Sequence, residues 1–236
     1  MTLKRLLYAM LVFAVFALPS RARTEDPPSK VTRKEAIATA ERYLRLVWTP
    51  TERNIFHGKD RRGIQVDTPD AAFQPANTRG GWWRPKQANT GMPYKWGGFD
   101  TPETFVAGVR AGRAAGDIYT EEKRRLLDDA VSEDAVGIDC SGLISRCWKL
   151  PASYSTRTLQ QLCEPIPPEQ LRAGDILNTP NGHVLLFAEW AGPDRSRLRA
   201  YEAGSPPTWK VLLNEMGTKW LLDQDYEAFR YRGMRE

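Results

Sequence analysis

The residues best suited to chemistry lie in the segment VGIDCSGLISRCWKL, residues 136–150. Cys140 stands where a helix is expected to begin, before an apolar run rather than inside it. The unpaired N–H groups and the positive dipole end of a helix stabilise a thiolate, and they can hold an oxyanion when the sulfur attacks a carbonyl. Gly142 is expected to keep this turn open to a substrate, whereas the charge of Asp139 opposes thiolate formation. The pattern predicts a nucleophilic cysteine.

A nucleophilic cysteine needs a base, and the chain has only two histidines. His57 lies in the polar stretch NIFHGKDRRG and is expected on the surface. His183, in NGHVLLFAEW, begins a predicted strand and can project into a cleft. Glu202 or Tyr201 on the next strand can lie beside it, but not both, because successive side chains point to opposite faces. Residue types alone leave open a structural role, with Cys140 a small buried apolar residue and His183 a satisfied strand-edge residue.

Hydrophobic periodicity predicts the elements that position these residues. Helices are expected over 33–48 and 102–114, from a cap at Thr120 through Ala130, and from Cys140 to Trp148. A short strand is expected at 63–66, and a linker helix with a proline turn over 153–172. Further strands are expected at 176–177, 183–190 and 198–203, the last two as a hairpin, and within KVLLNEM and EAFRYRGM. Helices followed by an antiparallel sheet indicate an α+β protein.

The first 22 residues have the three parts of a secretory signal peptide. They are a basic head at Lys4 and Arg5, an apolar run of 13 residues, and small residues around Arg21. An uncleaved anchor is the alternative, although the run is short for a bilayer. Removing 1–22 takes three basic residues and no acidic one, so the net charge falls from +5 to +2. This charge gives no electrostatic case for nucleic-acid binding. We expect an exported protein, periplasmic or extracellular, that is not inserted in a membrane after cleavage.

The three cysteines are Cys140, Cys147 and Cys163, and an odd count in an exported protein suggests a free thiol or an intermolecular bridge. On one helix, Cys140 and Cys147 would lie two turns or roughly 10 Å apart, too far for a disulfide. A Cys147–Cys163 disulfide and two unpaired buried cysteines both stay open. The spacing does not fit a zinc site, so neither a metal nor another cofactor is expected.

Four motifs between Tyr94 and Ser205 follow one another in a recognisable order. MPYKWGG resembles a Pro-Tyr-x-x-Gly-Gly motif, DCSGLISRCW an Asp-Cys-Ser-Gly helix, LRAGDIL a Gly-Asp turn and NGHVLLF a Gly-His-Val strand. On these motifs the chain resembles the NlpC family of bacterial cell-wall cysteine peptidases. The resemblance covers roughly half of the chain after the leader. It implies a papain-like, circularly permuted fold, with N-terminal helices packed on a central antiparallel sheet.

The resemblance also implies roles for the residues that match. It makes Cys140 the nucleophile, His183 the general base and Glu202 the residue that orients the base, with Asn181 and Glu189 as alternatives for the third position. The implied reaction is hydrolysis of an amide bond in a peptidoglycan stem peptide through a thioester, often between D-glutamate and the diamino acid. We expect a monomer that acts on this peptide substrate without a cofactor.

Three further positions are implied to shape the substrate site: Tyr94, Asp139 and Ser141. In this interpretation Asp139 pairs with a free amino end of the substrate. Trp82, Trp83 and Trp96 are expected to be packed rather than to line a groove.

The predicted organisation is a signal peptide over 1–22, an N-terminal helix and irregular segment over 23–93, and an NlpC-like catalytic domain over 94–236. The sequence departs from the family pattern in a predicted helical insertion, residues 99–136. A lid, a specificity wall and an edge decoration are its possible roles. Two other functions stay open: an amidase or acyltransferase with a non-wall substrate, and an inactive relative that binds wall peptides.

Overall fold

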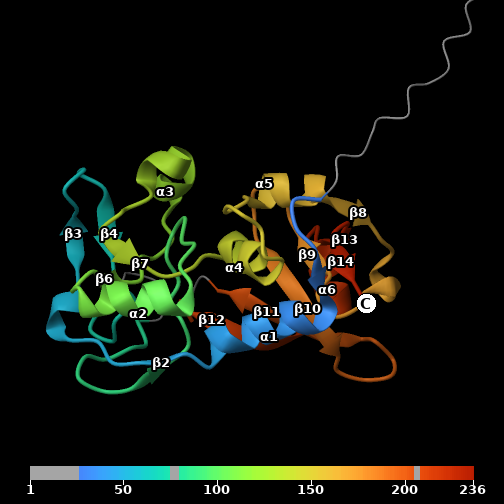
Figure 1. Ribbon diagram of the computed structural model, residues 1–236, viewed down its shortest axis with the longest axis horizontal. Helices are drawn as coiled ribbons and strands as arrows, with labels where there is room; N and C mark the ends of the chain where they lie inside the picture. The colour runs from blue at the N-terminus through green and yellow to red at the C-terminus, as the bar shows by residue number, and fades with distance from the viewer. Residues whose placement is uncertain (1–26, 75–79, 205–207) are drawn as a thin grey trace, which may run out of the picture.

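The computed structural model describes residues 27–74, 80–204 and 208–236. The predicted signal peptide, residues 1–22, lies outside these described residues. Figure 1 shows an elongated molecule with the main sheet and its helices at one end and a group of short strands and helices at the other. Helix α1 (Arg33–Leu44) runs along the sheet end of the molecule (Figure 1). The chain is a mixed α+β protein, which confirms the predicted class.

A six-stranded sheet forms the larger end of the molecule, in the order β12-β11-β10-β9-β13-β8. Every pair of neighbours in it is antiparallel, as the sequence predicts. The hairpin β10–β11 was predicted, whereas β8 falls in the region 153–172 where a linker helix and a turn were expected. The strands are β8 (Cys163–Pro165), β9 (Ile176–Asn178), β10 (Val184–Trp190), β11 (Arg197–Ala203), β12 (Val211–Gly217) and β13 (Glu227–Tyr231).

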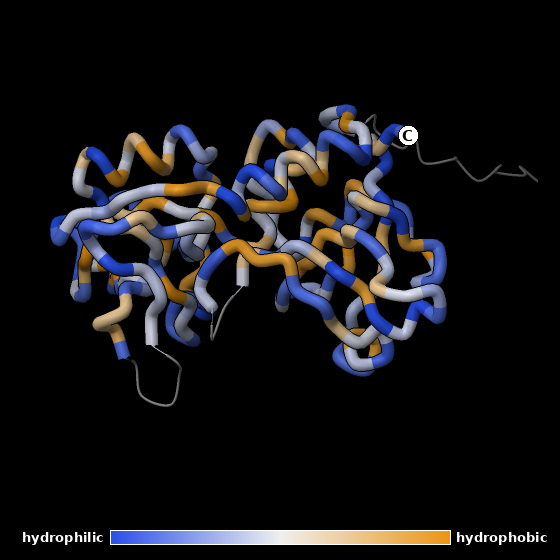
Figure 2. Tube along the Cα trace, turned by 90° about the horizontal axis from the view of Figure 1, so that it is seen from below, coloured by the Kyte–Doolittle hydropathy of each residue, from blue (hydrophilic) through white to orange (hydrophobic). Residues whose placement is uncertain are grey.

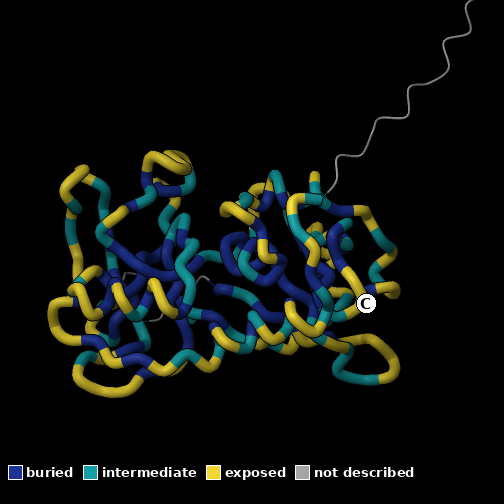
Figure 3. The backbone as a smooth tube through the Cα atoms, in the orientation of Figure 1, coloured by how far each residue is buried: buried dark blue, intermediate teal, exposed yellow. Residues whose placement is uncertain are grey.

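The sheet is covered on both faces, which explains why β10 begins with an unbroken apolar run. Val184 and Leu186 belong to the core beneath helices α1 and α4, while Leu185 and Phe187 belong to a second core on the opposite face. Successive side chains of a strand point to opposite faces, so each face receives every second residue. In Figure 2 the hydrophobic stretches run through the interior of both ends, and Figure 3 shows the same stretches as buried.

Helix α1 begins with the predicted capping box, in which Thr32 and Glu35 satisfy each other's backbone N–H groups. It ends at Leu44, four residues before the predicted end at position 48. Residues Val47 and Trp48 instead form strand β2, which pairs with β5 (Asn89–Thr90). The helical spacing of Val47 was misleading, because its side chain is exposed in the strand.

Segments from both sides of position 93 build the smaller end of the molecule (Figure 1). Hairpin β3–β4 pairs His57–Lys59 with Gln65–Asp67, close to the predicted strand at 63–66. Helix α2 (Pro102–Arg110) ends four residues before its predicted end, because the chain turns at Gly112, whose φ is +83°, into β6 (Ala114–Ala115). The amide of Asn54 donates to the carbonyls of Val109 and Arg113, so residues 50–74 and the predicted insertion pack as one unit.

The remaining elements are short. Helix α3 is capped by Thr120 and continues as a 3-10 turn to Ala130, and α4 starts at Cys140, both as predicted. Their bounds and those of the other elements are β1 (Val31–Thr32), η1 (Glu52–Asn54), α3 (Glu121–Leu126), η2 (Leu127–Ala130), β7 (Ala135–Val136), α4 (Cys140–Cys147), α5 (Thr156–Leu159), η3 (Gln160–Leu162), η4 (Pro168–Gln170), α6 (Thr218–Asp223) and β14 (Met234–Arg235).

Candidate active site

Cys140 is the first residue of helix α4, and its backbone is set by the segment MPYKWGG. Ile138 N donates to Pro93 O at 3.2 Å, and Asp139 N donates to Gly98 O at 3.2 Å. Among the described residues, the N–H of Cys140 itself has no intramolecular acceptor. That N–H is therefore free to hold a developing oxyanion at the helix start.

Asp139 caps this helix, a role that the sequence analysis did not assign. Its Oδ1 accepts from the backbone N–H of Gly142 at 2.6 Å and from the hydroxyl of Ser141 at 3.1 Å. Burial raises the pKa of Asp139, although these two hydrogen bonds act in the opposite direction. The residue before Cys140 thus has a structural reason to be an aspartate, since Asp is among the preferred N-cap residues.

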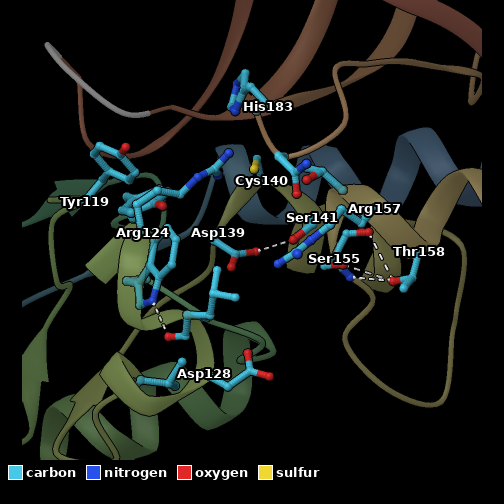
Figure 4. Close-up of a pocket in the computed structure, with 18 of the residues that line it drawn as sticks. Tyr119, Arg124, Asp128, Asp139, Cys140, Ser141, Ser155, Arg157, Thr158 and His183 are labelled. Carbon is cyan, nitrogen blue, oxygen red and sulfur yellow. Dashed lines mark hydrogen bonds between the residues drawn. The ribbon is translucent and has the colours of Figure 1, made fainter. Parts of the chain in front are cut away.

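His183 lies at the end of the β9–β10 turn, directly above Cys140 in Figure 4. Its backbone N–H donates to the Thr179 hydroxyl at 2.9 Å, and its carbonyl accepts from Thr179 N at 2.9 Å. Gly182 has no room for a side chain, because a Cβ would lie 2.2 Å from the Thr179 hydroxyl oxygen. The turn sequence Asn-Gly before the histidine is therefore part of what positions the ring.

Glu202 on strand β11 binds the imidazole, and it is the partner that the resemblance to the NlpC family implies. The Nε2 of His183 lies 2.7 Å from Glu202 Oε2, which leaves Nδ1 for the cysteine. Tyr201 points to the other face, where its hydroxyl donates to Glu41. The second carboxylate oxygen of Glu202 accepts from the Asn214 amide on β12. Sequence analysis missed Asn214, although a polar residue inside the apolar run VLLNEM was the available signal.

The ionisation of His183 reflects these neighbours. Burial lowers its pKa, but the charge of Cys140, a hydrogen bond with Cys140 and the carboxylate of Glu202 together raise the pKa to about 10. Glu202 is also perturbed: burial raises its pKa, but His183 and Asn214 outweigh burial and lower it. The raised pKa of His183 and the lowered pKa of Glu202 favour an imidazolium paired with a carboxylate.

The two alternative third residues do not bind the imidazole. Asn181 lies in the β9–β10 turn with a φ of +60° and lines the cleft without a hydrogen bond to His183. Glu189 lies on β10, where its carboxylate accepts from Arg199 at 2.8 Å. Glu202 is thus the described residue that bonds the ring.

A cleft of about 920 Å³ opens over Cys140. One wall comes from the predicted insertion and the other from α5 and η3, while His183 closes one end (Figure 4). The insertion is therefore a wall of the site rather than an edge decoration. The lining residues are Tyr94, Trp96, Gly97, Tyr119, Glu121, Arg124, Leu127, Asp128, Val131, Asp139, Cys140, Ser141, Ser155, Thr156, Arg157, Thr158, Gln161, Asn181, Gly182 and His183.

All three positions expected to shape the substrate site line this cleft: Tyr94, Asp139 and Ser141. Tyr94 is nearly buried against Trp209, with ring centroids 5.8 Å apart, and burial raises the pKa of its phenol. Ser141 is also mostly buried, and its hydroxyl is engaged by Asp139.

The predicted packing of the tryptophans holds for two of the three. Trp83 is fully buried, and Trp82 is partly buried with its indole N–H donating to Trp209 O at 3.0 Å. Trp96 instead lines the cleft, against Tyr119 at 5.7 Å between ring centroids. Trp96 is held in the fold as well as exposed to the cleft, because its indole N–H also donates to Leu127 O at 3.1 Å.

The second histidine, His57, does not reach the cleft. It is exposed, as expected, and it also has partners: its Nε2 bonds Asp70 at 2.8 Å and its ring stacks on Phe73 at 4.9 Å. This pair lies on the β3–β4 hairpin side of the smaller end. His57 therefore offers no base to Cys140.

All three cysteines are unpaired, so the Cys147–Cys163 disulfide does not form in this structure. Burial raises the pKa of both the Cys147 and the Cys163 thiol. Cys140 is the partly exposed one. Within residues 27–74, 80–204 and 208–236, no cluster of His, Cys, Asp and Glu side chains could hold a metal ion. No helix of the described chain is long and apolar enough to cross a membrane.

Comparison with known proteins adds no neighbour: no known family model matches the chain, and no curated protein is significantly similar to it. The resemblance carried by the four motifs therefore stays a prediction. The geometry of the cleft is what supports a function.

Proposed function

We propose that the chain is a cysteine-type hydrolase that cleaves amide bonds in peptides, with Cys140 as nucleophile, His183 as general base and acid, and Glu202 as the residue that orients the imidazole. The observation that carries this proposal is the 2.7 Å bond from His183 Nε2 to Glu202 Oε2, with the ring placed above Cys140. A nucleophile, a base and an orienting carboxylate in this order are what covalent acyl transfer requires.

In the proposed reaction, the thiolate of Cys140 attacks the carbonyl carbon of the scissile amide. The carbonyl oxygen becomes an oxyanion, for which the free N–H of Cys140 is an available backbone donor at the helix start. The imidazolium of His183 gives its proton to the leaving amine, and the C–N bond breaks to leave a thioester. A water molecule then loses a proton to His183 and attacks the thioester, which releases the acid and the thiolate.

The proposed substrate is a peptidoglycan stem peptide, and the proposed fold relation is to the papain-like, permuted NlpC peptidases. Helix α4 with its N-terminal cysteine packs on the sheet whose strand β10 follows the histidine, and this arrangement supports a papain-like core. A cleft of about 920 Å³ has room for several residues of a peptide. Export of the chain by the leader 1–22, and action as a monomer without a cofactor, belong to the same proposal.

Digestion of purified cell wall, with the fragments identified by mass spectrometry, tests the proposal. We expect new free amino and carboxyl ends at one peptide bond, and no release by Cys140→Ala. Cys163→Ala is the matched control, because that thiol lies outside the cleft, and it should release the same fragments as wild type. If Cys140→Ala still releases the wall fragments, Cys140 is not the nucleophile.

The same experiment separates the alternatives. A product in which the acyl group has moved to an added amine identifies an acyltransferase, and hydrolysis of a non-wall amide without cleavage of wall peptides identifies an amidase on this scaffold. Binding of wall fragments without any cleavage, together with a Cys140 alkylation rate no faster than that of a free peptide thiol, identifies an inactive binding protein.

A further inference from the structure

One cationic side chain of the insertion points into the cleft beside the nucleophile. Arg124 lies on helix α3, is half-buried, and extends toward Cys140 in Figure 4. Across the described part of the chain, its guanidinium forms neither an ion pair nor a side-chain hydrogen bond. A guanidinium carries five N–H donors and stays charged, so its position in a binding cleft needs an account.

The backbone beneath Arg124 is firmly anchored. The preceding residue, Lys123, is buried and its ammonium binds Asp117, while its backbone N–H is capped by the Thr120 hydroxyl at 3.2 Å. The other end of α3 is tied to the cleft wall, since Trp96 donates to Leu127 O. Arg124 is thus presented by a fixed helix rather than by a loose loop.

None of the three described carboxylates that line the cleft forms an ion pair or a hydrogen bond with it. Glu121 accepts a hydrogen bond from the Tyr119 hydroxyl at 2.8 Å, and Asp139 is occupied as the cap of α4. Asp128 lies at the end of the cleft away from Cys140 in Figure 4. The side chain that extends toward the reacting sulfur from this wall is therefore a cation without an ion-pair partner among the described residues.

We propose that Arg124 determines substrate specificity by binding a carboxylate adjacent to the scissile carbonyl, which makes acidic peptides the preferred substrate class. The inference rests on the proposed function of Cys140 as nucleophile. A guanidinium binds a carboxylate through two parallel hydrogen bonds, so it fixes the orientation of the acyl group as well as its charge. The proposal assigns the recognition of this carboxylate to the insertion.

Alkylation of Cys140 tests this without knowledge of the natural substrate. Iodoacetate carries a carboxylate on the carbon that the sulfur attacks, and iodoacetamide carries a neutral amide there. In both reactions the thiolate forms a C–S bond and iodide leaves with the electron pair of the C–I bond. The ratio of the two second-order rate constants therefore measures carboxylate recognition beside the sulfur, and His183 contributes equally to this ratio in every variant compared.

We expect Arg124→Met to lower the iodoacetate-to-iodoacetamide ratio by about threefold to tenfold, the range for a charge-assisted contact in a partly solvated site. Arg124→Lys should lower the ratio less, because lysine keeps the positive charge but lacks the two parallel N–H donors of the guanidinium. Arg125→Met is the matched control, since Arg125 is an exposed neighbour on the same helix that does not line the cleft. Its ratio should equal that of wild type.

The midpoint of thermal unfolding serves as the check on folding in all three variants, and any change in Cys140 reactivity that is common to both reagents cancels in the ratio. An unchanged ratio in Arg124→Met, or an equal drop in Arg125→Met, would overturn the inference. Failure of the proposed function is seen separately: no cleavage of wall fragments by wild type, while the alkylation ratio still depends on Arg124, would reject the hydrolase and leave the carboxylate site standing.

Discussion

The Cα of Gly142, in the first turn of α4, faces the carbonyl oxygen of Gly98, and a Cβ at position 142 would lie 2.1 Å from that oxygen. The same carbonyl accepts from Asp139 N at 3.2 Å. The expectation that Gly142 keeps the helix start open to a substrate was therefore wrong. Its missing side chain makes room for the segment MPYKWGG, which sets the position of Cys140.

Substitution Gly142→Ala should displace either α4 or the Gly98 backbone. We expect a loss of about 1–3 kcal/mol in the free energy of unfolding, as for other overpacked sites, and a fall in Cys140 alkylation rate. Urea unfolding and iodoacetamide kinetics measure the two effects. Gly217→Ala is the control, because its Cβ would meet only Trp220 Cβ at 3.7 Å, an ordinary contact. Equal stability of the two variants would contradict this account.

Two substitutions of Asp139 separate its role as the cap of α4 from its proposed role in substrate binding. Asp139→Ala should cost about 1 kcal/mol of unfolding free energy, because Gly142 N loses its acceptor, whereas Asp139→Asn keeps an acceptor oxygen and should cost less. If Asp139 also pairs with a substrate amino group, the Asn variant should keep its stability and raise KM. Chemical denaturation and steady-state kinetics on the same preparations distinguish the two roles.

The pH dependence of turnover should report the His183–Glu202 pair. With a His183 pKa of about 10, the proton needed by the leaving amine is present at neutral pH and below, and it is lost as the pH rises through 10. Glu202 raises this pKa, so Glu202→Gln should move the alkaline limb of the kcat/KM profile to lower pH. Glu189→Gln, a change on the exposed part of β10, should leave the limb in place. If the alkaline limb of Glu202→Gln lies at the same pH as that of wild type, Glu202 does not act on His183 as proposed.

Cysteine labelling should be selective in the native protein. Cys140 is partly exposed beside His183, while burial raises the pKa of the Cys147 and Cys163 thiols. Brief iodoacetamide treatment followed by peptide mapping should find one labelled cysteine, and the same treatment in denaturant should find three. Native labelling of Cys147 or Cys163 at a comparable rate would show that the site does not activate Cys140.

The buried ion pair between Lys123 and Asp117 lies beneath the cleft wall. Breaking it should lower the free energy of unfolding by a measurable amount. Lys123→Met leaves the Asp117 carboxylate buried without its cation, for which we expect a loss of about 3–5 kcal/mol at neutral pH. Burial raises the pKa of Asp117 from 3.8 to about 6 although Lys123 lowers it, so the variant's folded pKa should rise further.

The sign of the pH effect follows from that shift. A carboxyl whose folded pKa lies above its unfolded value loses stability as the pH rises through the folded pKa. The deficit of Lys123→Met against wild type should therefore be small near pH 4, close to the unfolded value of 3.8, and grow toward pH 7. The double variant Lys123→Met, Asp117→Asn should remove this pH dependence. A deficit that is independent of pH would show that packing rather than charge is lost.

Local sequence was sufficient for part of this molecule. Cys140 at a helix start, the cap at Thr120 and the hairpin that carries His183 and Glu202 were all predicted, because capping, strand alternation and turns depend on residues close together in the chain. Strand alternation also restricts the partner of the histidine to one of Glu202 and Tyr201, and the resemblance to the NlpC family rather than the alternation favours Glu202. These residues carry most of the proposed chemistry.

Tertiary structure decided the rest. Val47 and Trp48 leave the helical pattern to pair with β5, residues 163–165 become an edge strand against β13, and Asn214 reaches Glu202 from a third strand. Each of these contacts depends on a partner far away in the chain. The local spacing of residues carries no information on which distant segment a strand or side chain will contact. The placement of Arg124 beside Cys140 is of the same kind, because only the tertiary structure brings a cation of α3 into the same cleft as the sulfur.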